Sequence, residues 1–157
     1  MTVTYREMSS LDVPEVSKLH NDLLLFLKNE IHDDYLSCIE LETQDLSEKL
    51  NLFIENATKK IYIAVHKEKI VGFIAGEIMD CFLPISQKVG YLSGAFVLPG
   101  FRGMGIMKRL EYLLVSYFQD NGLKFVELNV LSRNLLGKRS WEKLGYEIFR
   151  EQMRKKI

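Results

Sequence analysis

The feature of this sequence with the clearest chemistry is a glycine-rich loop that joins a strand-like apolar run to a helix-like one. The loop is Pro99-Gly100-Phe101-Arg102-Gly103-Met104-Gly105, and helical spacing of apolar residues begins at Ile106. The first amides of a helix have no acceptor inside it and carry partial positive charge. Because glycines let an anion approach the backbone closely, the loop predicts a phosphate-binding site. Three nearby cations strengthen that prediction: Arg102, Lys108 and Arg109.

The loop matches neither of two familiar phosphate-binding motifs. It has no Gly-Lys-Ser/Thr, and Lys108 stands where a dinucleotide-binding loop has its third glycine. Taken alone, the pattern is equally typical of a tight turn that ends a strand, so both interpretations stay open on the loop alone.

Apolar periodicity predicts the elements that must position this loop. Ser9, Asp12 and Pro14 predict a helix start with a capping box. The expected elements are strand 3–6, helices from 9 and from 43, strands 61–65, 70–78 and 89–97, helix 106–121, strand 125–130, helix 134–144 and strand 146–149. This β-α-α-β-β-β-α-β-α-β order predicts an α/β fold in which about four helices flank a mixed, mostly antiparallel central sheet.

Composition narrows the class of protein. A length of 157 residues predicts a single domain, 1–157, and 21 Lys+Arg against 21 Asp+Glu argue against a nucleic-acid partner. Residues 1–78 hold 8 basic and 14 acidic residues, net −6, whereas residues 79–157 hold 13 and 7, net +6. No leader and no membrane-spanning run are visible. The two cysteines and three histidines are unclustered, so we expect a cytoplasmic protein with no bound metal.

Two segments resemble motifs of the GNAT superfamily of N-acetyltransferases. Residues 96–106 resemble its acetyl-CoA-binding pattern, V-x-P-x-x-R-G-x-G-I-G/A, and residues 134–146 resemble its second pattern, N-x-x-A-x-x-x-Y-E-K-x-G-F. The order of the elements also matches that family over nearly the whole chain. The resemblance therefore favours a GNAT-like domain over a simple turn.

The resemblance implies that acetyl-CoA is bound. It places the pyrophosphate on backbone amides of the loop and helix start, and the pantetheine arm beside the preceding strand, where that strand splays from the next one. The implied cofactor-binding residues are Phe96, Val97, Arg102, Gly103, Met104, Gly105, Ile106, Met107, Asn134 and Trp141.

Several positions depart from the family patterns. Met107 stands where Gly or Ala is usual, and Gly137 stands where Ala is usual. Trp141 replaces a tyrosine that protonates the departing thiolate in many members, and an indole N–H cannot transfer that proton. Ser93 replaces a glutamate often found on the strand before the loop.

Three residues remain as candidates for acid–base catalysis. Glu77, near the end of the neighbouring strand, is the best candidate for a general base, because a carboxylate held between strands can have a raised pKa. Ser93 could hold a water molecule. Tyr91 is the third candidate and is also explained as a residue that packs in the sheet.

The acceptor side is acidic. The segment from the first helix to the second has seven carboxylates and no Lys or Arg: Glu30, Asp33, Asp34, Glu40, Glu42, Asp45 and Glu48. Since the resemblance places the acceptor against these helices, we expect a cationic primary amine of a small molecule or peptide. Residues 23–27 are more apolar than one buried face requires, which is typical of a homodimer contact or an apolar substrate wall.

These features favour an acetyl-CoA-dependent N-acetyltransferase in which the amine attacks directly in a ternary complex. Two alternatives stay open. Trp141 and Ser93 suit a non-catalytic CoA-binding regulatory module, whereas Met104 and Met107 suit a transferase that uses another acyl-CoA or an O-acceptor.

Overall fold

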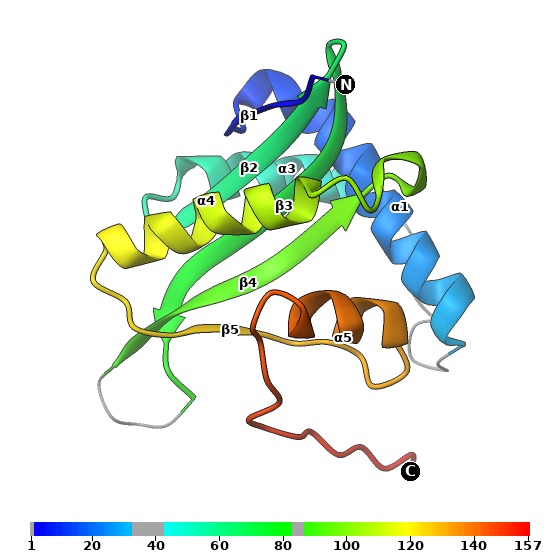
Figure 1. Cartoon of the computed structure of the whole chain (residues 1–157), viewed down its shortest axis with the longest axis vertical. Coiled ribbons are helices and arrows are strands. Elements are labelled where there is room, and N and C mark those ends of the chain that lie inside the picture. Colours follow the sequence, from blue (N-terminus) through cyan, green and yellow to red (C-terminus); the bar gives the residue numbers. More distant parts are fainter. Residues whose placement is uncertain (1, 33–42, 83–86) are drawn as a thin grey trace.

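The computed structural model describes residues 2–32, 43–82 and 87–157, which form a sheet in the strand order β1-β2-β3-β4-β5 (Figure 1). Neighbouring strands are antiparallel except the last pair, in which β5 runs parallel to β4. The sheet is therefore mixed and mostly antiparallel, as predicted. The strands are β1 (Thr4–Glu7), β2 (Lys59–His66), β3 (Lys69–Asp80), β4 (Lys88–Val97) and β5 (Val126–Leu128).

Helices cover both faces of this sheet (Figure 1). One face packs against α1 (Val13–Ile31) and α3 (Thr43–Glu55), and the other against α4 (Ile106–Asp120), with α5 (Leu135–Glu142) beside it. Short 3-10 turns, Ser10–Asp12 and Pro99–Phe101, precede α1 and α4. The predicted α/β class and the predicted helices are confirmed.

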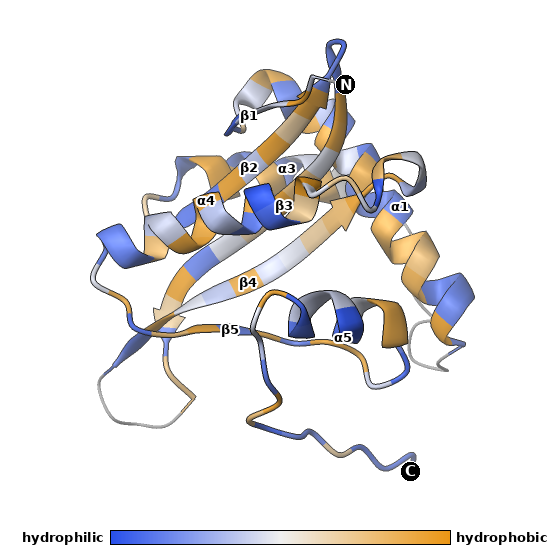
Figure 2. Cartoon of the chain, in the orientation of Figure 1, coloured by the Kyte–Doolittle hydropathy of each residue, from blue (hydrophilic) through white to orange (hydrophobic). Residues whose placement is uncertain are grey.

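Two apolar layers hold the helices on the sheet, one on each face. Hydrophobic residues recur along the strands and at intervals along the helices (Figure 2). Under α1 and α3, Val16, Ile63 and Phe73 are at most 1% exposed. Under α4, Leu110 and Phe118 are buried against the opposite face. A Cβ at position 90 would collide with the Phe118 ring, so Gly90 lets α4 lie directly on β4.

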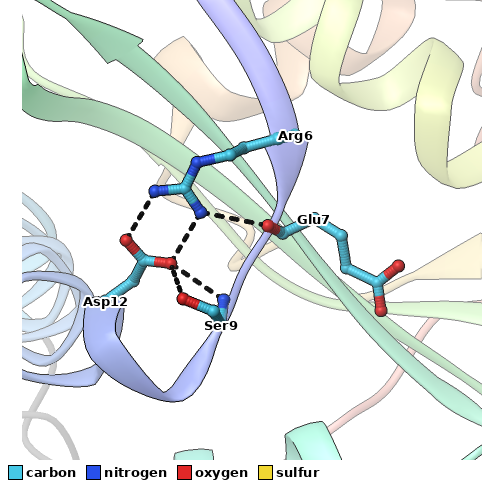
Figure 3. Close-up of polar contacts among 4 residues, drawn as sticks. All are labelled: Arg6, Glu7, Ser9 and Asp12. Carbon is cyan, nitrogen blue, oxygen red and sulfur yellow. Dashed lines mark hydrogen bonds and ion pairs between the residues drawn. The ribbon is translucent and has the colours of Figure 1, made fainter.

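The start of α1 is held by a buried carboxylate (Figure 3). Arg6 donates from Nη1 and Nη2 to the two oxygens of Asp12, both at 2.7 Å, and Ser9 donates its backbone N–H to Asp12 Oδ2 at 2.8 Å. The contact between Ser9 and Asp12 confirms the predicted capping box. The hydrogen bonds from Arg6, and then those from Ser9, hold the pKa of Asp12 well below its ordinary value.

We expect Asp12→Asn to lower the free energy of unfolding by about 1–2 kcal/mol at pH 7, because charge-assisted bonds to a buried carboxylate are lost. A lowered folded-state pKa stabilises the fold above the unfolded pKa and loses that effect as pH falls towards the folded value. The free energies of unfolding of wild type and variant, measured with urea, should therefore approach each other as the pH falls below about 4. Asp80→Asn is the control, because the Asp80–Lys88 pair is exposed; an equal loss there would contradict a specific effect of Asp12.

The predicted last strand is wrong. Residues 146–149 are irregular, and Ile148 and Phe149 are 63% and 64% exposed. The Tyr146 amide donates to Trp141 O at 3.1 Å, and its hydroxyl donates to Glu111 on α4 at 3.2 Å. These bonds tie the start of the segment to α4 and α5, and the apolar residues that follow pair with no strand of the sheet. The observed order accordingly ends with α5.

None of the helices in the three described ranges has the length and the apolar character that crossing a bilayer demands. No group of three or more His, Cys, Asp or Glu side chains gathers there in an arrangement that could hold a metal ion.

Candidate active site

The glycine-rich loop presents a run of open amides at the start of α4. The first backbone hydrogen bond of the helix runs from Arg109 N to Gly105 O, at 3.1 Å. Before it, Arg102 N donates to Pro99 O, at 3.2 Å. Within the described chain, the amides between these two, from Gly103 to Lys108, have no backbone acceptor. Such a run at the positive end of a helix dipole fits a phosphate group.

Two glycines give this run its shape. Gly103 and Gly105 both have φ of +77°, in the left-handed region that residues with a Cβ rarely adopt. A Cβ at either position would have no heavy atom within 4 Å. The backbone here is therefore open to a ligand, and glycine is required by conformation rather than by crowding.

The sheet opens beside this loop. β5 pairs with β4 only from Gly90 to Leu92, whereas β4 continues to Val97 (Figure 1). Ser93 has no partner on β3, because Gly76 pairs with Leu92 and Ala75 with Gly94, and it is therefore a bulge at the point where the two strands diverge. The open edge of β4 beyond Ser93 has backbone groups with no neighbouring strand on that side. An extended chain can be held there in the manner of an added strand.

The Arg102 side chain does not lie where a residue that only binds phosphate would lie. Its guanidinium carbon is 5.1 Å from the Phe26 ring centre on α1 and 5.4 Å from that of Phe96 on β4. Its Nε donates to Val97 O at 3.0 Å. The side chain thus links the loop, the end of β4 and the helix that covers the opposite face.

We expect Arg102→Lys to lower the free energy of unfolding by about 1–2 kcal/mol although it keeps the charge. Lysine cannot stack flat between two rings and donate a planar N–H at the same time. Urea unfolding measures the loss, and isothermal titration with CoA gives the affinity of the same variant. Unchanged stability with weakened CoA binding would show instead that the guanidinium acts mainly on phosphate.

The other predicted loop residues divide between core and surface. Phe96, Val97 and Ile106 are buried, Met107 packs against the apolar layer under α4, and Met104 is 53% exposed. Met107 thus points into the core. Because Val97 O already accepts from Arg102, it has one lone pair left for a ligand.

Asn134 caps α5, and that explains one departure from the family pattern. Its Oδ1 accepts from Gly137 N at 2.9 Å. A Cβ at position 137 would lie 2.5 Å from Asn134 Nδ2 and 2.8 Å from Cγ. Alanine, usual at this position, would displace the capping side chain, so Gly137 accompanies this particular cap.

Trp141 packs against the apolar layer under α4. Its ring meets that of Tyr146 edge to face, with 5.6 Å between centres. Burial is the main cause that raises the pKa of Tyr146, and the neighbouring Glu111 adds to it. Trp141 is thus held by core contacts beside the site.

Two of the three candidate catalytic residues lie opposite each other where β4 and β5 begin to separate. Glu77 on β3 pairs in register with Tyr91 on β4, which pairs with Glu127 on β5. Side chains directly opposite on neighbouring strands share a face. That face is the one covered by α1 and α3, since Ala75, two residues before Glu77, belongs to its core. Ser93 follows two residues after Tyr91.

Lysine and asparagine neighbours complete this row. Lys59 on β2 pairs in register with Glu77, and its Nζ lies 3.1 Å from Glu77 Oε2. The pKa of Tyr91 is raised, and burial is the largest cause. Arg150 and a hydrogen bond with Asn129 act in the opposite direction, whereas Glu77 and Glu127 add to the increase. A row of charged and phenolic groups therefore crosses the sheet beside the split, and it can hold a polar substrate and move a proton.

Sequence reasoning missed Glu127, Asn129 and Arg150. Glu127 stands between two apolar residues on β5, so its side chain points to the opposite face from theirs. Only the register with β4 places it beside Tyr91. Arg150 stands in the segment predicted to follow a final strand. No pattern in the sequence indicates that its guanidinium lies over the rings of Phe82 and Phe149.

Most of the acidic segment lies outside the described residues. Asp33, Asp34, Glu40 and Glu42 fall there, and the side chain of Asp45 is also not described. Glu30 is exposed on α1, and Glu48 is exposed on α3. The predicted acidic acceptor rim therefore stays a prediction.

The described residues thus form an α/β fold in which a helix starts with six open amides beside a strand that loses its neighbour. Comparison with known families agrees with that class. The model of the Acetyltransferase (GNAT) family matches residues 25–146, and the chain belongs to this family. No curated protein sequence matches.

Solved structures share the fold at low identity. The BH1408 protein from Bacillus halodurans, as a tetramutant, superposes with a TM-score of 0.81 at 21% identity, over 98% of this chain and 99% of that one. Aminoglycoside N-acetyltransferase AAC(6')-Iy in complex with CoA gives 0.79 at 17%, over 99% and 95%. A predicted acetyltransferase with acetyl-CoA from Clostridium acetobutylicum gives 0.78 at 18%, over 99% and 96%.

Proposed function

We propose that this chain is an acetyl-CoA-dependent N-acetyltransferase that acts as one domain, 1–157, on a primary amine of a small molecule or peptide. The observation that carries the proposal is the run of open amides from Gly103 to Lys108 beside the split between β4 and β5. The amides would hold the pyrophosphate, and the free edge of β4, with Phe96 and Val97, would hold the pantetheine arm. Neighbours of the same fold were solved with CoA or acetyl-CoA.

Acetyl-CoA supplies an activated acetyl thioester and a thiol leaving group. The protein must deliver a neutral amine to it. Glu77 is the proposed base: Lys59 fixes its Oε2 at 3.1 Å, and Oε1 has no hydrogen-bond partner in the described chain. Glu77, directly or through a water held at Ser93, would take one proton from the ammonium, and the second amine proton would leave with the thiol.

The proposed acceptor is a cationic amine. Glu77 and Glu127 flank Tyr91 on the face that α1 and α3 cover, so negative charge lies where an ammonium would approach. One neighbour of this fold was solved with a bisubstrate analogue that joins CoA to an acetylneamine, an aminoglycoside derivative. That supports an amine acceptor of small size.

The test is release of CoA thiol from acetyl-CoA across a panel of primary amines, with isothermal titration of CoA in parallel. We expect tight CoA binding and amine-dependent release. Binding without release for any amine would favour the alternative of a CoA-binding regulatory module, which Trp141 and Ser93 motivate. If a longer acyl-CoA is used faster than acetyl-CoA, the alternative of a transferase that uses another acyl-CoA would be favoured.

A further inference from the structure

Gly94 on β4 is a strand glycine for which the surrounding structure gives no steric reason. Glycine inside a strand weakens it, and such a glycine often marks a place where a ligand comes close to the backbone. At Gly76 and Gly90, a Cβ would collide with side chains of α4, so crowding explains those two glycines. A Cβ at Gly94 would meet, among the described residues, one atom within 4 Å, Cε2 of Phe73 at 3.6 Å, which is an ordinary contact.

Backbone conformation does not require glycine at this position either. The glycines with positive φ are Gly103, Gly105, Gly122 and Gly145, and Gly94 is not among them. Alanine therefore fits at position 94 in conformation and in space. What its methyl group would occupy is the space next to the backbone of β4.

That space lies on the face of the sheet that α1 and α3 cover. Gly94 pairs in register with Ala75 on β3, and Ala75 belongs to the core of that face. The backbone of Gly94 is itself partly exposed. Larger side chains form the neighbouring pairs on either side of this small pair: Phe73 with Phe96, and Glu77 with Tyr91. We call the space over Gly94, between these two pairs, the Gly94 recess.

The free edge of β4 leads to the Gly94 recess. β5 occupies this edge from Gly90 to Leu92, whereas β4 continues to Val97 (Figure 1). A cofactor arm added along the free edge from Val97 must therefore end near Ser93 and Gly94, where β5 begins. The thioester and its acyl group are the end of that arm, so they come to lie beside the recess.

We propose that the Gly94 recess receives the acyl group of the donor and that Gly94 determines how long this group can be. The missing Cβ leaves room for an acyl chain at least one carbon longer than acetyl, so the site accepts propionyl-CoA as well as acetyl-CoA. This inference rests on the acyl-CoA binding in the proposed function and adds the range of donors that the same site admits.

The experiment is isothermal titration of CoA, acetyl-CoA, propionyl-CoA and butyryl-CoA into wild type and Gly94→Ala, without an acceptor. We expect wild type to bind propionyl-CoA within threefold of acetyl-CoA. Gly94→Ala should bind CoA within twofold of wild type but lose tenfold or more in affinity for propionyl-CoA and butyryl-CoA, because its methyl group fills the recess. Thermal melts should show a variant at least as stable as wild type, since alanine fits there and strengthens the strand.

Gly100→Ala is the matched control, because a Cβ at Gly100 also meets nothing within 4 Å and lies at the phosphate end of the arm. Whatever it does to CoA itself, its ratio of propionyl-CoA to acetyl-CoA affinity should equal that of wild type. The inference is overturned if wild type binds propionyl-CoA more than threefold more weakly than acetyl-CoA, or if Gly94→Ala changes that ratio by less than threefold. Failure of wild type to bind any of the four ligands, CoA included, would instead count against the proposed function itself.

Discussion

Replacing Gly103 and Gly105 together with alanine is expected to weaken CoA binding about a hundredfold while the protein stays folded. Both residues have φ of +77°, and a residue with a Cβ pays roughly 1–2 kcal/mol to adopt that conformation. The altered loop should relax out of it when free, which turns the open amides away from a common centre. Binding of CoA must then restore the strained shape. The conformational cost at the two alanines together corresponds to about a hundredfold increase in the dissociation constant.

Isothermal titration with CoA measures this effect, and Gly122→Ala is its matched control. Gly122 has φ of +76° at the opposite end of α4, and a Cβ there would also meet nothing within 4 Å. The control should lower the melting temperature, because Gly122 closes the end of α4, and leave CoA affinity unchanged. Equal losses of affinity in both variants would mean that general destabilisation, not the loop, controls binding.

The shape of the glycine-rich loop and the start of α4 could be predicted because their determinants are local. Gly103 and Gly105 specify their own backbone conformation, and the helical spacing from Ile106 specifies which amides come first. Ser9 and Asp12 likewise predict the start of α1 from a spacing of three residues. In each case the physics acts within one turn of chain, so the residue types and their spacing are sufficient.

The row of polar residues beside the split could not be predicted to the same depth because it depends on register. The row from Lys59 to Glu127 exists because four strands align one residue from each, and the bulge at Ser93 shifts the register beyond it. A slip of one residue would turn each side chain to the other face. The apolar alternation of residues 146–149 failed for a related reason, since alternation shows which residue types are present but not whether the segment pairs with a strand.

Glu77→Gln is expected to lower kcat for acetyl transfer by about a hundredfold or more, the range typical for loss of a general base. Glutamine keeps the shape of the side chain and a donor or acceptor near Lys59, but it cannot take a proton from the ammonium. CoA affinity should stay within twofold, because Glu77 lies on β3 and the open amides lie at the start of α4. Stopped-flow single-turnover kinetics at saturating acetyl-CoA isolates the transfer step from product release.

Glu7→Gln is the matched control for this prediction, because Glu7 on β1 forms an equivalent ion pair with Lys60 on β2, at 2.6 Å. It removes the same charge from the same sheet, far from the split, and should leave kcat unchanged. Lys59→Met separates the base from its partner: it keeps the Glu77 carboxylate, so its loss of kcat should be much smaller than that of Glu77→Gln. A Glu77→Gln variant within threefold of wild type would exclude Glu77 as the base and transfer that role to a water held beside Ser93.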